Sequence, residues 1–423
     1  MMEGNGKFQY GHGGIPGRKQ LMLNVTIAAG TSLPVTAAID PGNVQGGEVF
    51  PHTLEQIRQL VQGAEHEIIM DRGIATQENI YLMLQTPGTY FIGPMKDELC
   101  RSWVVEQLER LGDAAFTPVN YRSKQEIKQD RPSHYLAAET EYTFQVETNP
   151  RKKGEPRRKK GTREFVTVTV RAVIYRDTEK QQRDAQHRQE DIKEVETALQ
   201  ELQAKLNKRN LRTKEACQQK VQEIFKGKPD MRRAYKVTVD TNQYGAVTLA
   251  WEKNQAVIQE LAKTDGIFVL LTNHLKERVK AEELLTRYRG RNDIEMSFRF
   301  LKGAMDLTQI LLRKDGRVDA YCFLKVLGMF VINFAAWYLQ KYGKTKLSPQ
   351  KLQKQFGNTT LVEQRLQPFG IRRWIGTNIT EPIEILVELL RLPHPKILIE
   401  LLNVPLDYGQ IIDEWVKKYM AAT

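Results

Sequence analysis

One stretch of the sequence, residues 288–302, combines a carboxylate, a phenol and several cations at spacings that suggest shared chemistry. No proline interrupts it and its single glycine, Gly290, lies near the start, so we predict a helix. At about 100° per residue, five polar side chains fall within an arc of roughly 80°: Tyr288, Arg291, Glu295, Arg299 and Lys302. A carboxylate on such a face can bind a divalent metal, and the cations can bind phosphate oxygens.

A structural role explains the same spacing. Ile294, Phe298 and Leu301 form an apolar stripe beside the polar face, which can pack against a core. Glu/Arg pairs three and four residues apart are also typical of an ordinary solvent-exposed helix face. On spacing alone, the exposed helix face is the better-supported interpretation.

The order of residue types adds specificity. Two, three and six residues separate Tyr288, Arg291, Glu295 and Lys302, and this spacing resembles the Y-R-E-K signature of DDE transposases of bacterial insertion sequences. The resemblance implies that Glu295 is the last metal-binding carboxylate of a ribonuclease H-like catalytic domain. It also implies that Arg291 and Lys302 contact DNA phosphates and that Tyr288 positions the backbone or the nucleophile. We assign Arg299, on the same face, to DNA binding.

A second carboxylate, Asp71, follows a short apolar strand predicted at 66–70 and precedes Arg72-Gly73. The end of a buried strand is a common place for metal chemistry in α/β folds, although a helix-capping loop residue is the simpler interpretation of an isolated aspartate. The order of Pro-Gly-Asn at 41–43, a helix, this strand and Asp-Arg-Gly resembles the middle of the same catalytic domain. By that resemblance Asp71 is the second metal-binding carboxylate. The resemblance also implies that the catalytic site binds two divalent ions, Mg²⁺ or Mn²⁺.

The first carboxylate of the family has no obvious counterpart. Asp40 is the one aspartate before Asp71. If strands 19–28 and 33–39 form the second and third strands of a ribonuclease H-like sheet, Asp40 lies about three strand spacings, roughly 14 Å, from the strand of Asp71. We therefore expect an N-terminally shortened transposase, or a reading frame begun at an internal methionine, with impaired catalysis.

The domain organisation follows from the long separation of the two carboxylates. Asp71 lies 224 positions before Glu295 (295 − 71), which is too far for one compact fold, and the family tolerates a large insertion there. The resemblance covers about residues 10–345. We predict an α/β, ribonuclease H-like catalytic domain in two parts with its first strand missing, a large α+β insertion and a helical C-terminal extension; the ranges are 1–100 and 265–345, 101–264, and 346–423.

The insertion contains a strongly basic run at 151–160, between strands predicted at 141–146 and 165–175. Seven cations and one acid there favour a phosphate-binding hairpin tip, and a solvated loop that is disordered without DNA is equally compatible. The cations that we assign to DNA binding are Lys152, Lys153, Arg157, Arg158, Lys159 and Lys160.

A heptad seam follows within the predicted helix 177–210. Its apolar residues step by three and four: Ile192, Val195, Leu199, Leu202 and Leu206. Because about two heptads are regular, we predict a helix pair within the chain, with 211–225 as the antiparallel partner, rather than a long dimeric coiled coil.

The bulk composition agrees with a polyanionic partner. The chain has 63 Lys and Arg against 51 Asp and Glu, a formal net charge of +12. The three cysteines form no CxxC pair, so we expect neither a disulfide framework nor a cysteine zinc site. We expect a cytoplasmic, nucleoid-associated protein that binds element ends and target DNA as a homodimer.

Two alternatives to this interpretation stay open. Residues 320–339 are apolar over nearly the length of a membrane span, but Lys325 and Asn333 interrupt them, so we predict a buried helix and no membrane. The rival function is a non-enzymatic nucleic-acid-binding protein, in which the basic hairpin and the paired helices supply all the activity.

Overall fold

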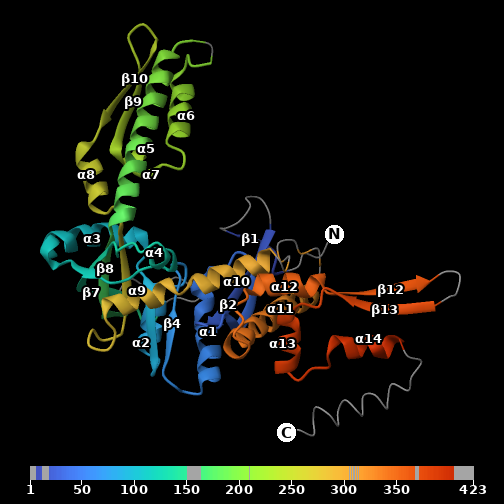
Figure 1. Cartoon of the computed structure of the whole chain (residues 1–423). Coiled ribbons are helices and arrows are strands. Elements are labelled where there is room, and N and C mark those ends of the chain that lie inside the picture. Colours follow the sequence, from blue (N-terminus) through green and yellow to red (C-terminus); the bar gives the residue numbers. More distant parts are fainter. Residues whose placement is uncertain are drawn as a thin grey trace. The chain divides into compact units, whose positions relative to one another are not determined.

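The computed structural model describes residues 6–11, 19–149, 163–208, 210–303, 305, 307, 310, 312, 314–366 and 371–403. The chain divides into two compact units (Figure 1). One unit combines residues 1–60 with 290–423, and we call it the discontinuous unit. The other is residues 61–289, the central unit.

The central unit is built on a six-stranded sheet with the order β4-β5-β11-β8-β7-β6. The pair β4 and β5 is parallel, and the other neighbours are antiparallel. The strands are β4 (His66–Ile69), β5 (Thr89–Pro94), β6 (Thr117–Val119), β7 (Tyr135–Glu147), β8 (Phe165–Asp177) and β11 (Ile267–Thr272). The run from Ala172 to Tyr175 is buried throughout, as expected for a strand with neighbours on both sides and cover on both faces.

Helices lie between these strands and after the last of them. They are α2 (Gln77–Leu84), α3 (Asp97–Leu111), the 3₁₀ turn η1 (Asp113–Ala115), α4 (Lys124–Lys128) and α9 (Ala281–Arg289). Helix α9 places Leu284 and Leu285 in a core with Ile92 of β5 and Tyr175 of β8. Burial of these side chains holds α9 against the sheet.

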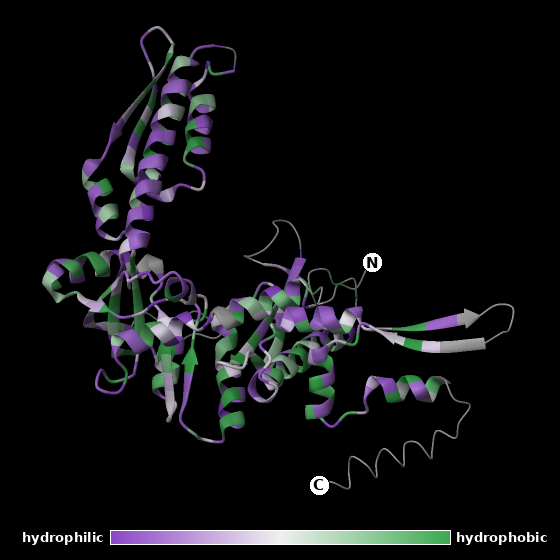
Figure 2. Cartoon of the chain, in the orientation of Figure 1, coloured by the Kyte–Doolittle hydropathy of each residue, from purple (hydrophilic) through white to green (hydrophobic). Residues whose placement is uncertain are grey.

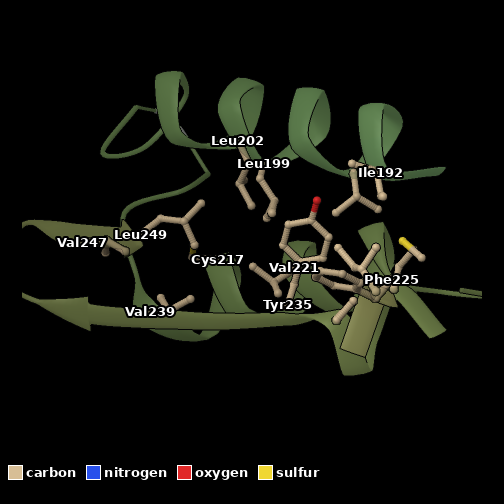
Figure 3. Close-up of a cluster of buried hydrophobic side chains, with 14 of the residues drawn as sticks. Ile192, Leu199, Leu202, Cys217, Val221, Phe225, Tyr235, Val239, Val247 and Leu249 are labelled. Atoms are coloured by element: carbon tan, nitrogen blue, oxygen red, sulfur yellow. The ribbon is translucent and has the colours of Figure 1, made fainter. Parts of the chain in front are cut away.

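Residues 178–264 form a separate core within the central unit. It contains α5 (Thr178–Ala204), α6 (Lys214–Ile224), α7 (Pro229–Ala234), β9 (Tyr235–Thr241), β10 (Val247–Lys253) and α8 (Gln255–Lys263). Figure 3 shows Leu199 and Leu202 of α5 facing residues of α6 and the β9-β10 hairpin. The predicted seam is confirmed, since its first four residues are buried and Leu206 packs against the same cluster. Hydrophilic residues cover much of the remainder of α5 (Figure 2).

The discontinuous unit begins with an antiparallel three-stranded sheet in the order β1-β2-β3. Its N-terminal elements are β1 (Gln9–Tyr10), β2 (Lys19–Ala28), β3 (Leu33–Pro41) and α1 (Gly46–Val61). The C-terminal elements are α10 (Asn292–Lys302), α11 (Asp315–Tyr342), α12 (Pro349–Asn358), β12 (Thr360–Leu366), β13 (Ile371–Thr377), α13 (Glu381–Leu389) and α14 (Pro395–Asn403).

Helix α11 is buried on one side only. It contacts β3, α10, α12 and α13, and the Asn333 amide in its middle donates a 2.6 Å hydrogen bond to the Ser32 carbonyl oxygen. Phe323, Leu324 and Val331 are exposed on another side, so the expectation of a buried helix holds for one face. Within the described ranges, α11 is the one helix long and apolar enough to span a membrane by length and composition.

The sheet arrangement differs from the expected one in two respects. The hairpin β2-β3 pairs with β1 and belongs to a sheet other than the one that contains β4. Strands β7 and β8, which we expected inside the insertion, pair through β8 with β11, which lies in the range 265–345 that we predicted for the catalytic domain. The part of 101–264 with a core of its own is therefore 178–264, and the predicted domain boundaries stay a prediction.

The C-terminal region is not purely helical. Strands β12 and β13 form an antiparallel hairpin between α12 and α13, where the sequence indicated a helical extension. The β-branched residues Val362 and Ile375, which face each other across the hairpin, suit a strand, but the Pro residues of this region led us to expect only helices and breaks.

Candidate active site

The Y-R-E-K stretch forms two helices rather than one. Helix α9 ends at Arg289 and α10 begins at Asn292, with Gly290 and Arg291 in the turn between them. Glycine has a low helix propensity, which agrees with an interruption at this position. The break assigns Tyr288 to the central unit and Arg291, with the rest of the signature, to the discontinuous unit.

Tyr288 is a core residue. Only 6% of it is exposed, and it packs with Leu284, Leu285 and strand residues of the six-stranded sheet. The single helix predicted over 288–302 is therefore wrong, because α9 ends before Gly290, and the common face of Tyr288 and Glu295 stays a prediction. Burial of Tyr288 instead fixes the end of α9 to the sheet.

Helix α10 presents the other polar residues of the signature to solvent. Glu295, Arg299 and Lys302 are exposed, and the Glu295 side chain is 62% accessible. The Arg291 Nε atom lies 4.0 Å from Glu295 Oε1, the distance of a weak, solvent-screened pair. This carboxylate is therefore accessible to a metal ion and the neighbouring cations to phosphate.

The apolar side of α10 anchors the helix. Leu301 is buried and Phe298 packs beside it, in a cluster with Leu23 and Met329, which confirms that part of the predicted stripe. Ile294 is only partly exposed to solvent. The anchoring explains how a helix with an exposed carboxylate keeps a fixed orientation within its unit.

Asp71 lies two residues after the end of β4 and is exposed. Its Oδ1 atom accepts a 2.7 Å hydrogen bond from the Gly73 backbone N–H, and its carbonyl oxygen accepts one from Ala75 N–H at 3.1 Å. The loop thus orients the carboxylate at the carboxyl end of β4, a common position for functional groups in α/β sheets.

Asp71 and Glu295 belong to different units, so their shared metal site stays a prediction. Asp40 is the penultimate residue of β3 in the discontinuous unit, where its Oδ2 atom accepts a 2.8 Å hydrogen bond from the Asn24 amide of β2. The structure thus gives Asp40 a partner on the neighbouring strand.

A charged group that the sequence did not indicate lies on the strand that leads to Asp71. Glu67, inside β4, lies 2.6 Å from Arg287 Nη1 and 2.5 Å from His274 Nε2, measured from Oε2. Tyr90 stacks on the His274 ring with 4.7 Å between ring centroids. The sequence could have indicated this site, because Glu67 lies in a strand next to Ile68 and Ile69 and a partly buried carboxylate needs hydrogen-bonding partners.

The basic run at 151–160, with its six assigned cations, lies outside the described residues. The strands on either side pair as far as Glu147 and Phe165, and the Thr148 backbone N–H donates to the Glu164 carbonyl oxygen. The run therefore connects two hydrogen-bonded strands, as the hairpin prediction requires, and its DNA contacts stay a prediction.

A family model described as "Transposase DDE domain" matches residues 2–331. A search of curated protein sequences finds no match. A search of solved structures finds the cryo-EM structure of the piggyBac transposase synaptic complex with hairpin DNA, at 9% sequence identity and a TM-score of 0.37. The alignment covers 98% of this chain and 54% of that one, so this chain spans about half the length of that protein.

Proposed function

Because this chain belongs to the DDE transposase family, we propose that it is the transposase of an insertion sequence of the Y-R-E-K type. Its reaction is metal-dependent cleavage of DNA at the element ends, followed by transfer of the 3′-hydroxyl to target DNA. The observation that carries the proposal is the spacing of Arg291, Glu295 and Lys302 within a family match that includes all three.

The residues have distinct proposed roles. Glu295 and Asp71 hold Mg²⁺ or Mn²⁺, which activates the attacking oxygen and stabilises the leaving oxygen when bound. Both carboxylates are exposed, and the donor set is all oxygen, which suits these hard cations. Arg291, Arg299 and Lys302 hold DNA phosphates beside Glu295 through charge-assisted hydrogen bonds. Tyr288 acts as a positioning residue, because its buried ring fixes α9 immediately before the signature turn.

We further propose that the 423-residue chain cleaves DNA poorly. In-line displacement with two metals uses three carboxylates in this family, and the resemblance gives counterparts for two of them, Asp71 and Glu295. The chain alone and the chain extended by an N-terminal strand with an aspartate should be compared on the same DNA. Equal, Glu295-dependent rates for the two would contradict the proposed impairment.

The central test is strand cleavage of labelled duplexes taken from the DNA that flanks the coding sequence, in Mg²⁺ or Mn²⁺. Asp71→Asn and Glu295→Gln should each abolish metal-dependent cleavage, measured on the extended chain if the short one is too slow, and should change the Kd for DNA less than about threefold. Glu282→Gln, an exposed carboxylate on α9, is the matched control and should cleave normally.

The non-enzymatic alternative predicts the opposite pattern. If the protein only binds nucleic acid, it binds DNA without cleaving it in either metal, and neither carboxylate variant changes DNA binding.

We propose that the chain acts as a homodimer on duplex DNA at the nucleoid. The mass of its complex with an element-end duplex measures the stoichiometry.

A further inference from the structure

Four ionisable side chains meet where the β7-β8 hairpin joins α5, within the central unit. Glu126 comes from α4, His134 directly precedes β7, Asp177 ends β8, and Glu179 lies in the first turn of α5. Glu126 and Asp177 are buried, and only 11% of the His134 side chain is exposed. None of the four belongs to the Y-R-E-K signature or to the loop of Asp71.

The imidazole of His134 is oriented between carboxylates. Its Nδ1 atom lies 3.0 Å from Glu126 Oε1 and 4.0 Å from Glu179 Oε1, yet this buried nitrogen makes no hydrogen bond of acceptable geometry. On the other side of the ring, Nε2 lies 3.5 Å from Asp177 Oδ1. A carboxylate at the second ring nitrogen is the usual arrangement around a metal-binding histidine, because it directs the unprotonated nitrogen at the metal.

The cluster has more negative than positive side chains, which favours binding of a cation. Three carboxylates surround the imidazole, and one guanidinium offsets them, since Arg131 Nη1 lies 3.1 Å from Glu179 Oε1. An ionised, buried carboxylate is costly without a neutralising partner.

We propose that Glu126, His134 and Glu179 bind one divalent transition-metal ion of the Zn²⁺ type, with water as a further ligand. Their ligand atoms all lie within 4.8 Å of one another, and tetrahedral zinc at about 2.0–2.1 Å from each ligand needs separations of roughly 3.4 Å. Glu179 is the most exposed of the three, at 45%, and lies near the start of a helix, so it can approach the others.

Ligand chemistry separates this site from the predicted catalytic one. One imidazole nitrogen and two carboxylates favour Zn²⁺ over Mg²⁺, which prefers oxygen ligands only. The ion would connect α4, the start of β7 and the start of α5. It would therefore stabilise the junction at which residues 178–264 leave the sheet.

The test uses the full chain without a histidine tag, stripped with EDTA and titrated with ZnCl₂ in excess Mg²⁺ by calorimetry, with metal content measured after dialysis. We expect one Zn²⁺ per chain, no binding by His134→Gln and at least tenfold weaker binding by Glu179→Gln. His187→Gln is the matched control, because His187 forms an exposed pair with Glu190 at 3.4 Å. Both the control and Glu295→Gln should bind Zn²⁺ as the parent does.

Two results would overturn the proposal. Absence of stoichiometric Zn²⁺ binding would mean that the cluster is a set of side-chain contacts without a metal. Retention of the ion by His134→Gln, or its loss in Glu295→Gln, would place the metal elsewhere. Circular dichroism in EDTA checks that each variant is folded, and the partly exposed Glu179→Gln supplies the answer if His134→Gln does not fold.

Discussion

Arg287 Nη1 donates a 2.6 Å hydrogen bond to Glu67 Oε2, and this ion pair joins two segments 220 residues apart in sequence. Glu67 belongs to the strand that ends just before Asp71, and Arg287 directly precedes Tyr288 on α9. The pair therefore connects the loop of one predicted metal ligand with the helix that leads to the Y-R-E-K turn.

We expect Glu67→Gln to destabilise the chain by about 1.5 kcal/mol, the lower end of the range for hydrogen bonds to charged groups, because the Arg287 side chain is partly exposed to solvent. His274, at 2.5 Å from the same oxygen, loses its ionised partner as well. Urea unfolding measures the change. Glu55→Gln removes an exposed pair with Arg58, both 52% accessible, and should cost less than about 0.5 kcal/mol. Equal effects would show that the Glu67 pair is no stronger than a surface contact.

The seam of α5 is a second target. Leu199 is fully buried, and we expect Leu199→Ala to destabilise residues 178–264 by about 3–5 kcal/mol through the cavity it leaves. Leu60→Ala, at a residue that is 56% exposed on α1, serves as the control and should change stability by less than about 1 kcal/mol. Limited proteolysis and urea unfolding measure both. A small loss for Leu199→Ala would mean that the site repacks.

Glu196 should make stability depend on pH. The hydrogen bond from Lys253 lowers the pKa of Glu196 below its usual 4.5, against a smaller opposing effect of burial and with a further contribution from Tyr235. A lowered pKa in the folded state stabilises the fold above the unfolded pKa, and this stabilisation is lost as pH falls through the folded value.

The stability difference between the parent chain and Glu196→Gln should therefore be largest near neutral pH and shrink below pH 4.5. Denaturant unfolding over that pH range measures it. Glu201→Gln, in an exposed pair with Lys205 on the same helix, is the comparison and should show a smaller dependence. A constant difference for Glu196→Gln would rule out its titration as the cause.

The basic run should carry sequence-independent DNA affinity. Replacement of Arg157, Arg158, Lys159 and Lys160 by Ala should weaken binding to any duplex, and each lost phosphate contact should lower the slope of log K against log salt by about 0.9. Binding isotherms at several salt concentrations measure the slope. Substitution of four exposed lysines elsewhere, at positions 220, 226, 236 and 263, controls for net charge. An unchanged slope in the variant without Arg157, Arg158, Lys159 and Lys160 would show that the run is a solvated loop that does not contact DNA.

The sequence by itself determined the features that depend on residues a few positions apart. The spacing of Arg291, Glu295 and Lys302 places a carboxylate between cations on α10, and the family match agrees with the function that this spacing implies. The three- and four-residue spacing of apolar residues such as Leu199 and Leu202 predicted the helix pair, because the 3.6-residue period of a helix places such residues on one face.

Only the tertiary structure decided which distant segments meet. It placed the Tyr288 ring in the core, paired β8 with β11, joined Glu67 to Arg287 and gathered Glu126 and His134 beside α5. Periodicity contains no information about such pairings, since each depends on loop closure and on burial shared between segments far apart in the chain. The turn at Gly290 has the same origin, because packing of α9 on one core and α10 on another overrides a pattern that one continuous helix would also satisfy.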